Sequence, residues 1–272
     1  MAHFSSSDGL QLWYEDEGDG LPVLCLSGLT RTTRDFDYVA PHLAECRMIR
    51  MDYRGRGKSD WAKDYHDYAL PVEIRDALEL MDHLGVARFA KSGTSRGGLN
   101  AMGMAVAAPG RLLGACFNDI GPELDPRGLT TIMGYLGRRP AAKTHEDAAS
   151  ALEKVLAGFE GVPRERWLEE ARKHFVARGD GLDITYDPDL RRAVEEAGHA
   201  PDLWPFFEAL AGKPVCLIRG AGSDLISAAT ADRMQARRPD MIRADVPGRG
   251  HVPYLDEPQA VAALREWIGR LQ

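Results

Sequence analysis

The chain has few cysteines, four in 272 residues, and no two of them form a Cys-x-x-Cys pair. Cys25, Cys116 and Cys216 lie in apolar stretches, whereas Cys46 lies in a polar connection. Isolated thiols of this kind argue against a disulfide framework and against a cysteine-based metal site. We therefore expect buried, reduced thiols.

The chain also lacks an excess of positive charge. It has 34 Lys and Arg against 41 Asp and Glu, which gives a net charge of −7, and no basic stripe alternates with aromatic residues. This balance argues against a nucleic-acid partner. No apolar run approaches the length of a membrane span, and the stretch Met1–Gly20 lacks the apolar centre of a signal peptide. We expect a cytoplasmic protein without a membrane partner, and the sequence leaves its oligomeric state open.

Nucleotide-binding motifs are missing as well. No Gly-x-Gly-x-x-Gly follows a predicted strand. Gly57-Lys58-Ser59 imitates the end of a phosphate-binding loop, but the opening glycine of that loop would be residue 52, which is aspartate. We therefore exclude a nucleotide ligand.

Short apolar runs that alternate with helical patterns are abundant. Strands are predicted at 10–14, 23–26, 48–51, 112–118, 214–219 and 242–246, and another begins at Phe89 and leads to Ser95. Helices are predicted at 35–45, 74–84, 99–107, 227–238 and 261–271. Continuous apolar strands indicate burial on both faces, so the fold class is α/β, with a mostly parallel sheet flanked by helices.

The alternation stops between Pro122 and Pro205, where no convincing strand occurs and charged helical stretches appear at 145–158 and 163–178. We interpret residues 122–205 as a helical cap inserted over the carboxyl edge of the sheet, where open α/β sheets bind ligands. Residues 1–121 and 206–272 would form the core. The alternative is that these helices pack elsewhere on the molecule.

The pentapeptide Gly93-Thr94-Ser95-Arg96-Gly97 fits the pattern G-x-S-x-G between a predicted strand and a predicted helix. A serine in such a sharp turn projects its hydroxyl into open space, and the residues two before and two after it must be small. Ser95 is therefore the candidate nucleophile. An ordinary serine in a glycine-rich loop is the alternative, because short motifs have many false positives.

A serine nucleophile needs a base, and the base needs a group that orients it. His251 follows a strand and a Gly-x-Gly turn, which places it at the same sheet edge as Ser95. Other histidines lie among charged helical residues, where a solvated position is expected: His66, His83, His145, His174 and His199. Two aspartates compete as the acid. We favour Asp224, which follows the strand before that of His251, over Asp119, which follows the earlier strand.

These pieces occur together in one order: Ser27-Gly28-Leu29, Asp52-x-Arg54-Gly55-x-Gly57-x-Ser59, Gly93-x-Ser95-x-Gly97 and Gly250-His251. In this combination the chain resembles the α/β-hydrolase superfamily, in its serine-nucleophile branch with a helical cap. The resemblance implies Ser95 as nucleophile, Asp224 as acid and His251 as base. It implies an oxyanion hole formed by the backbone N–H groups of Leu29 and Arg96. It also implies a structural turn at 52–59, and no metal, nucleotide or organic cofactor.

The function expected from these features is that of a carboxylesterase-like serine hydrolase that cleaves small acyl substrates through an acyl-enzyme on Ser95. Three alternatives use the same fold. One is a carbon–carbon bond hydrolase of the meta-cleavage-product type, whose acidic substrates would need a cationic anchor from Arg31, Arg34, Arg96, Arg138 or Arg139. The others are an acyltransferase and a ligand sensor.

Three aromatic residues precede the strand that leads to Asp224: Trp204, Phe206 and Phe207. We expect Trp204 and Phe207 to reach from the cap hinge toward the substrate pocket. Packing of the hinge itself is the alternative, since aromatic side chains dominate both cores and ligand pockets.

Overall fold

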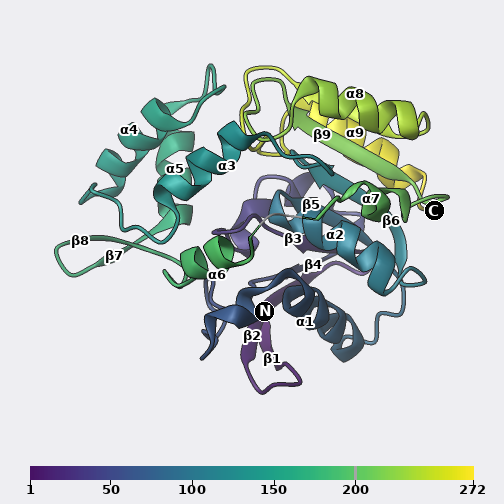
Figure 1. The fold of residues 1–272 in the computed structure, drawn as a ribbon, viewed down its shortest axis with the longest axis horizontal. Helices are drawn as coiled ribbons and strands as arrows, with labels where there is room; N and C mark the ends of the chain where they lie inside the picture. Colours follow the sequence, from purple (N-terminus) through teal and green to yellow (C-terminus); the bar gives the residue numbers. More distant parts are fainter. Residues whose placement is uncertain (199–200) are drawn as a thin grey trace.

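An eight-stranded sheet forms the centre of the computed structural model, which describes residues 1–198 and 201–272 (Figure 1). The strand order is β1-β2-β4-β3-β5-β6-β9-β10. Only the pairs β1–β2 and β2–β4 are antiparallel. The strands are β1 (Ala2–Ser5), β2 (Gln11–Glu17), β3 (Leu21–Leu26), β4 (Cys46–Met51), β5 (Phe89–Thr94), β6 (Leu112–Asn118), β9 (Val215–Gly220) and β10 (Ile242–Val246). The predicted α/β fold class is confirmed.

Helices cover both faces of this sheet. On one face α1 (Leu70–His83), α2 (Arg96–Ala107), α7 (Trp204–Glu208) and α8 (Ala228–Arg237) contribute to one apolar cluster with the sheet. On the other face α9 (Pro258–Gly269) packs with the segment that follows β3. No helix in the described part of the chain combines the length and the apolarity needed to cross a membrane.

One predicted core helix is wrong. Residues 35–45 do not form a continuous α-helix but two short 3₁₀ helices, η1 (Thr33–Phe36) and η2 (Ala40–His42). Pro41 lies between the two apolar residues that pack into the core, Val39 and Leu43. A proline inside a helix removes a backbone donor and clashes with the preceding turn, so the segment breaks there.

The described part of the segment 122–205 lies largely to one side of the sheet (Figure 1). It contains α3 (Pro126–Tyr135), α4 (His145–Val155), α5 (Arg164–His174), β7 (Phe175–Arg178), β8 (Gly181–Ile184) and α6 (Leu190–Glu196). The expectation of a strand-free segment is wrong, because β7 and β8 pair as an antiparallel hairpin. Its strands are short, and β7 is mostly exposed, so the hairpin has no apolar run that would reveal it. The division at residues 122 and 205 remains a prediction.

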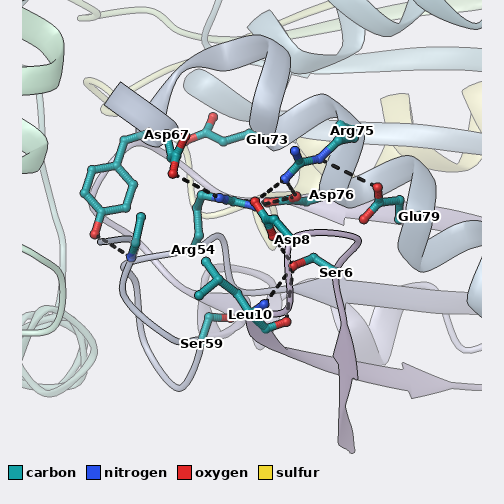
Figure 2. A network of polar contacts seen from close by, with 12 residues as sticks. Ser6, Asp8, Leu10, Arg54, Ser59, Asp67, Glu73, Arg75, Asp76 and Glu79 are labelled. Atoms are coloured by element: carbon teal, nitrogen blue, oxygen red, sulfur yellow. Dashed lines mark hydrogen bonds and ion pairs between the residues drawn. The ribbon is translucent and has the colours of Figure 1, made fainter. Parts of the chain in front are cut away.

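The charged turn after β4 is held by buried ion pairs. Arg54 is fully buried and donates to both carboxylate oxygens of Asp76 on α1, at 2.7 and 2.8 Å, while also pairing with Asp8 (Figure 2). The equally buried Arg56 pairs with Glu73, one turn earlier on the same helix. Bidentate arginine–carboxylate pairs are strong and directional. They therefore fix this turn against α1 and leave neither arginine available for a ligand.

All four cysteines are buried and free. All four lie within strands, as the apolar surroundings of Cys25, Cys116 and Cys216 predict. Cys46 differs from the expectation of a polar connection, because it is the first residue of β4 and packs in the core.

Candidate active site

Ser95 occupies a sharp turn between β5 and α2, and its backbone has a φ angle of +49°. This conformation is unfavourable for a residue with a side chain, and strained positions of this kind cluster at functional sites. The two flanking glycines are required by space. A Cβ on Gly97 would lie 1.9 Å from the carbonyl oxygen of Leu26, and a Cβ on Gly93 would lie 2.2 Å from that of Gly97.

The Ser95 hydroxyl begins a chain of three hydrogen-bonded side chains. Its Oγ lies 3.1 Å from Nε2 of His251, and Nδ1 of His251 lies 2.7 Å from Oδ2 of Asp119. Asp119 is fully buried, and its Oδ1 accepts the amide of Gly220 at 2.7 Å. Its Oδ2 also accepts the Ser223 hydroxyl at 2.6 Å. These contacts fix the carboxylate in the position from which it faces the imidazole.

Asp224 does not contact His251, so the prediction that it orients the histidine is wrong. Its carboxylate accepts a hydrogen bond from the Thr131 hydroxyl on α3 at 3.2 Å. The physical reason is the path of the loop after β10. A Cβ on Gly220 at the end of β9 would lie 2.3 Å from the carbonyl oxygen of Gly250. The loop therefore crosses directly over β9, and His251 reaches the residue that follows β6.

The predicted oxyanion donors lie beside Ser95 without competing acceptors. Within residues 1–198 and 201–272, neither the Leu29 amide nor the Arg96 amide takes part in a hydrogen bond. Arg96 begins α2, so its amide is one of the unsatisfied donors at a helix N-terminus. Its side chain is held elsewhere, with Nε 2.7 Å from Glu73. Their role as an oxyanion hole remains a prediction.

A cavity of about 400 Å³ opens at Ser95 and His251. Its wall is mostly apolar, with side chains from α3 and α4 that include Ile132, Leu152 and Val155. Such a cavity suits a small acyl group, because ligand pockets are mainly apolar with few polar groups. We call it the Ser95 pocket.

Trp204 and Phe207 do not line the Ser95 pocket, so the prediction that they bind substrate is wrong. Phe207 is fully buried, and its ring centroid lies 6.2 Å from that of Phe117 in the core. Trp204 packs edge-on against Phe207, with the Arg237 guanidinium 4.3 Å from its ring. Because α7 packs against α2 and the sheet, both aromatics stabilise that contact.

His174 was expected on the solvated surface, but it lines the Ser95 pocket, and its Nε2 is buried without a hydrogen-bond partner in the described structure. Burial lowers its pKa to about 3, helped by the nearby Arg31 guanidinium. This ring is therefore neutral at physiological pH. The fifth of those histidines, His199, lies outside the described residues.

Arg31 connects the segment after β3 to α5. Its guanidinium lies 3.2 Å from both Asp35 and Glu170, and the Glu170 side chain is 4% exposed. Burial opposes the charge of Arg31, but the two carboxylates outweigh that effect and raise its pKa. Sequence patterns do not reveal this cluster, because Glu170 is 139 positions away from Arg31.

The five arginines considered as carboxylate anchors differ in their partners. Arg31, Arg34, Arg96 and Arg139 pair with carboxylates at Asp35, Asp37, Glu73 and Asp183. Arg138 lines the Ser95 pocket, is exposed, and has no ion pair within the described ranges. Of the five, only Arg138 is therefore available for a ligand without the loss of an existing pair.

Comparisons with known proteins agree with this geometry. The alpha/beta hydrolase family matches residues 23–264. The 3-hydroxybutyrate-oligomer hydrolase of Cupriavidus necator is 37% identical over 257 residues, covering 90% of this chain and 87% of the relative. The 2-(acetamidomethylene)succinate hydrolase of Mesorhizobium japonicum is 26% identical over 92% of this chain and 87% of its own. The crystal structure of an alpha/beta hydrolase from Novosphingobium aromaticivorans superposes with a TM-score of 0.92 at 39% identity, covering 99% of both chains. The chain belongs to the alpha/beta hydrolase family.

Proposed function

We propose that this protein is a serine hydrolase that cleaves esters of short acyl chains. The observation that carries the proposal is the hydrogen-bonded chain from Ser95 through His251 to Asp119. It joins a hydroxyl, an imidazole and a buried carboxylate in the arrangement that activates a serine nucleophile.

In the first half of the reaction Ser95 Oγ attacks the ester carbonyl while His251 Nε2 takes its proton. The tetrahedral intermediate then loses the alcohol, whose oxygen receives that proton from His251, and an acyl group remains on Ser95. In the second half His251 takes a proton from water, the resulting hydroxide attacks the acyl carbonyl, and Ser95 regains its proton as the acid leaves.

Asp119 holds the imidazole in the required orientation and stabilises its positive charge. The developing oxyanion would accept hydrogen bonds from the amides of Leu29 and Arg96. Removal of one such donor typically costs about two to three orders of magnitude in kcat.

The substrate class follows from the Ser95 pocket and from the relatives. A mostly apolar cavity of about 400 Å³ accommodates a short acyl unit rather than a long chain. The hydrolase of 3-hydroxybutyrate oligomers, 37% identical over 90% of this chain, supports short hydroxy-acid esters as the first substrates to test.

Carbon–carbon bond hydrolysis is the second candidate. The observation that favours it is Arg138, an exposed arginine on the pocket wall without an ion pair among the described residues. Such a guanidinium would hold the carboxylate of an acidic substrate. An acyltransferase or a ligand sensor would use the same residues. The tests must therefore measure catalytic turnover separately from covalent labelling of the serine.

A fluorophosphonate probe tests the nucleophile. We expect one label on the wild type and none on Ser95→Ala, whereas Ser150→Ala should label normally. The Ser150 hydroxyl only bonds the carbonyl of Glu146 within α4. Labelling that persists in Ser95→Ala would refute the assignment of Ser95 as the nucleophile.

Turnover then separates the functions. The wild type is offered 3-hydroxybutyrate dimer and trimer, p-nitrophenyl esters of graded acyl length, and an acidic dienone. Rapid ester hydrolysis supports the esterase, and preference for the dienone supports the carbon–carbon hydrolase. An enzyme that is labelled but turns over none of these substrates contradicts both.

A further inference from the structure

A second, larger cleft of about 830 Å³ lies between the turn after β4 and the β7–β8 hairpin. Backbone hydrogen bonds join the two sides at its base. The amide of Gly57 donates to the carbonyl of Thr185, and that of Asp187 donates to the carbonyl of Gly55, each at 2.8 Å. We call this cavity the basic cleft, for the residues described next.

Cations outnumber acids on the wall of the basic cleft. Its basic residues are Arg34, Lys58, Arg139, Arg172, Lys173 and Arg178, and its acidic residues are Glu15, Asp52 and Asp183. The chain as a whole carries a net charge of −7. A concentration of positive charge in a cleft of an acidic protein attracts anions locally.

The three acids are already engaged. Asp183 pairs with Arg139 at 2.9 Å and with Arg178 at 3.4 Å. Asp52 accepts the backbone amides of Thr33 and Lys58, and Glu15 pairs with Arg50 at 3.2 Å. These contacts reduce the charge that the acids present to a ligand.

Two of the cations remain available. Lys58 and Arg172 are exposed, and neither pairs with a carboxylate anywhere in residues 1–198 or 201–272. The Lys58 ammonium is held 4.0 Å from the centre of the Trp13 ring, which limits its freedom without neutralising it. The carbonyl of Arg172 accepts a hydrogen bond from Arg34 at 2.9 Å, so the backbone that carries its side chain is also fixed.

The basic cleft also exposes apolar surface. Trp61 is 51% exposed and Val176 is 46% exposed, which are high fractions for large apolar side chains, and Phe175 lies beside them. Apolar surface of this kind next to cations fits a ligand with an apolar body and an anionic end.

The basic cleft adjoins the Ser95 pocket. Four residues line both cavities: Arg139, Phe175, Ile184 and Tyr186. A flexible chain whose scissile ester lies at Ser95 would have to pass only this shared wall to place its end in the cleft.

We propose that the basic cleft binds the carboxylate end of a short oligoester whose ester bond is cleaved at Ser95. The ligand class is an oligomer of a small hydroxy acid with a free terminal carboxylate. The identity of this substrate rests on the proposed function, whereas the existence of an anion site rests on the cleft alone.

The kinetic test compares the 3-hydroxybutyrate trimer with its methyl ester, which lacks the terminal charge, and follows cleavage of the esters between hydroxybutyrate units, not release of methanol. The wild type should favour the free acid in kcat/KM. The variant Lys58→Gln/Arg172→Gln should lower the ratio of the two kcat/KM values about three- to tenfold, the size expected for two exposed ion pairs. Raised salt should lower the wild-type ratio in the same direction, because exposed charges are screened.

The control carries the same change in net charge elsewhere. Arg88 and Arg265 are exposed and have no carboxylate partner in the described parts of the chain, and Arg88→Gln/Arg265→Gln should leave the ratio as in the wild type. If the ratio of kcat/KM values falls equally in the control, the effect comes from net charge, and the proposal that the cleft binds the carboxylate is overturned. A ratio unchanged in Lys58→Gln/Arg172→Gln would also overturn it.

A binding measurement separates this proposal from the proposed function. Ser95→Ala, which should not turn over, is titrated calorimetrically with the acid and with the methyl ester. Tighter binding of the acid, lost when Lys58→Gln/Arg172→Gln is added, supports the cleft even if no ester is hydrolysed. If Ser95→Ala binds both compounds equally and the wild type hydrolyses them, the proposed carboxylate site in the cleft is refuted. The proposed function then still stands.

Discussion

Nδ1 of His251 lies 2.7 Å from Oδ2 of Asp119, although the strands that precede these two residues are not neighbours. Asp119 follows β6 and His251 comes after β10, and β9 lies between them in the sheet. The contact exists because the end of β9 is Gly220, which has no side chain to obstruct the loop above it. The orientation of the proposed base thus depends on Gly220, whose amide also donates to the Asp119 carboxylate.

This geometry predicts opposite results for two aspartates. Asp119→Asn should lose about four orders of magnitude in kcat, because the amide favours the wrong imidazole tautomer. Asp224→Asn should lose far less, since its carboxylate accepts a hydrogen bond from the Thr131 hydroxyl and does not contact His251. Steady-state kinetics on a short ester, with circular dichroism as the control for folding, check the ranking. A larger loss in a folded Asp224→Asn would refute the role proposed for Asp119.

Ser95 and His251 could be predicted from the sequence because each has a local signature. The serine needs glycines two positions before and after it, and the histidine follows a strand and a glycine turn. The acid has no such signature. Its choice depends on the three-dimensional path of residues 247–251, and adjacency of strands was the wrong guide to that path.

The pocket was harder to predict for a related reason. An aromatic near a hinge packs in a core or lines a ligand site with equal ease, and only the packing of α7 against α2 decides the case of Trp204 and Phe207. His174 was misplaced because its charged neighbours along α5 suggested a solvated helix. Its own side chain lies on the face that turns toward the Ser95 pocket.

The corrected pocket predicts different effects for two apolar residues. Leu152→Ala should enlarge the Ser95 pocket and shift the preferred acyl length upward, since Leu152 lines it. Phe207→Ala should leave that preference unchanged but lower the free energy of unfolding by about 3–5 kcal/mol, because the ring is fully buried. Relative rates across graded p-nitrophenyl esters and denaturant unfolding measure the two effects. A changed length preference in Phe207→Ala would place α7 at the substrate after all.

The buried cluster between α5 and the segment after β3 predicts coupled losses. Glu170→Gln removes one of the two carboxylates that face Arg31 and the nearer carboxylate at Lys173, so the buried positive charge is less well compensated. The free energy of unfolding should fall by about 3 kcal/mol. Because Arg31 lies two residues after Leu29, one of the proposed oxyanion donors, kcat should fall more than KM rises.

Glu169→Gln is the matched control for that variant. Glu169 precedes Glu170 on the same helix, but its side chain is 52% exposed and contacts the Tyr38 hydroxyl. Exposed pairs contribute little to stability, so this variant should change the free energy of unfolding by less than about 1 kcal/mol. Equal losses in the free energy of unfolding of the two variants would show that the buried cluster contributes no more to stability than an exposed pair.

Lys91 predicts an unusual dependence of stability on pH. Its side chain is fully buried in β5, and its Nζ donates to the Ser92 carbonyl at 2.7 Å. No carboxylate in the described residues pairs with it. Burial lowers its pKa in the folded protein from 10.5 to about 7.

The sign of the effect follows from proton binding. Between pH 7 and pH 10.5 the unfolded chain holds a proton on Lys91 that the folded chain has released. The unfolded state therefore binds more protons, and this residue's contribution to stability rises with pH across that window. Below pH 7 both states are protonated, so the full cost of burying the charge remains.

Lys91→Met should thus stabilise the protein at or below pH 7. One pKa unit corresponds to 1.36 kcal/mol, so the lowered pKa of Lys91 predicts a gain of about 3 kcal/mol in the free energy of unfolding once relaxation of the site is allowed for. The gain over the wild type should shrink steadily toward pH 10.5, where the native lysine is neutral in its buried position. Urea unfolding of both proteins at several pH values measures the difference, in which other titrating groups largely cancel. Lys63→Met, at an exposed position, should show no such trend. A gain for Lys91→Met that stays constant with pH would mean that lost packing contacts, not the buried charge, set the effect.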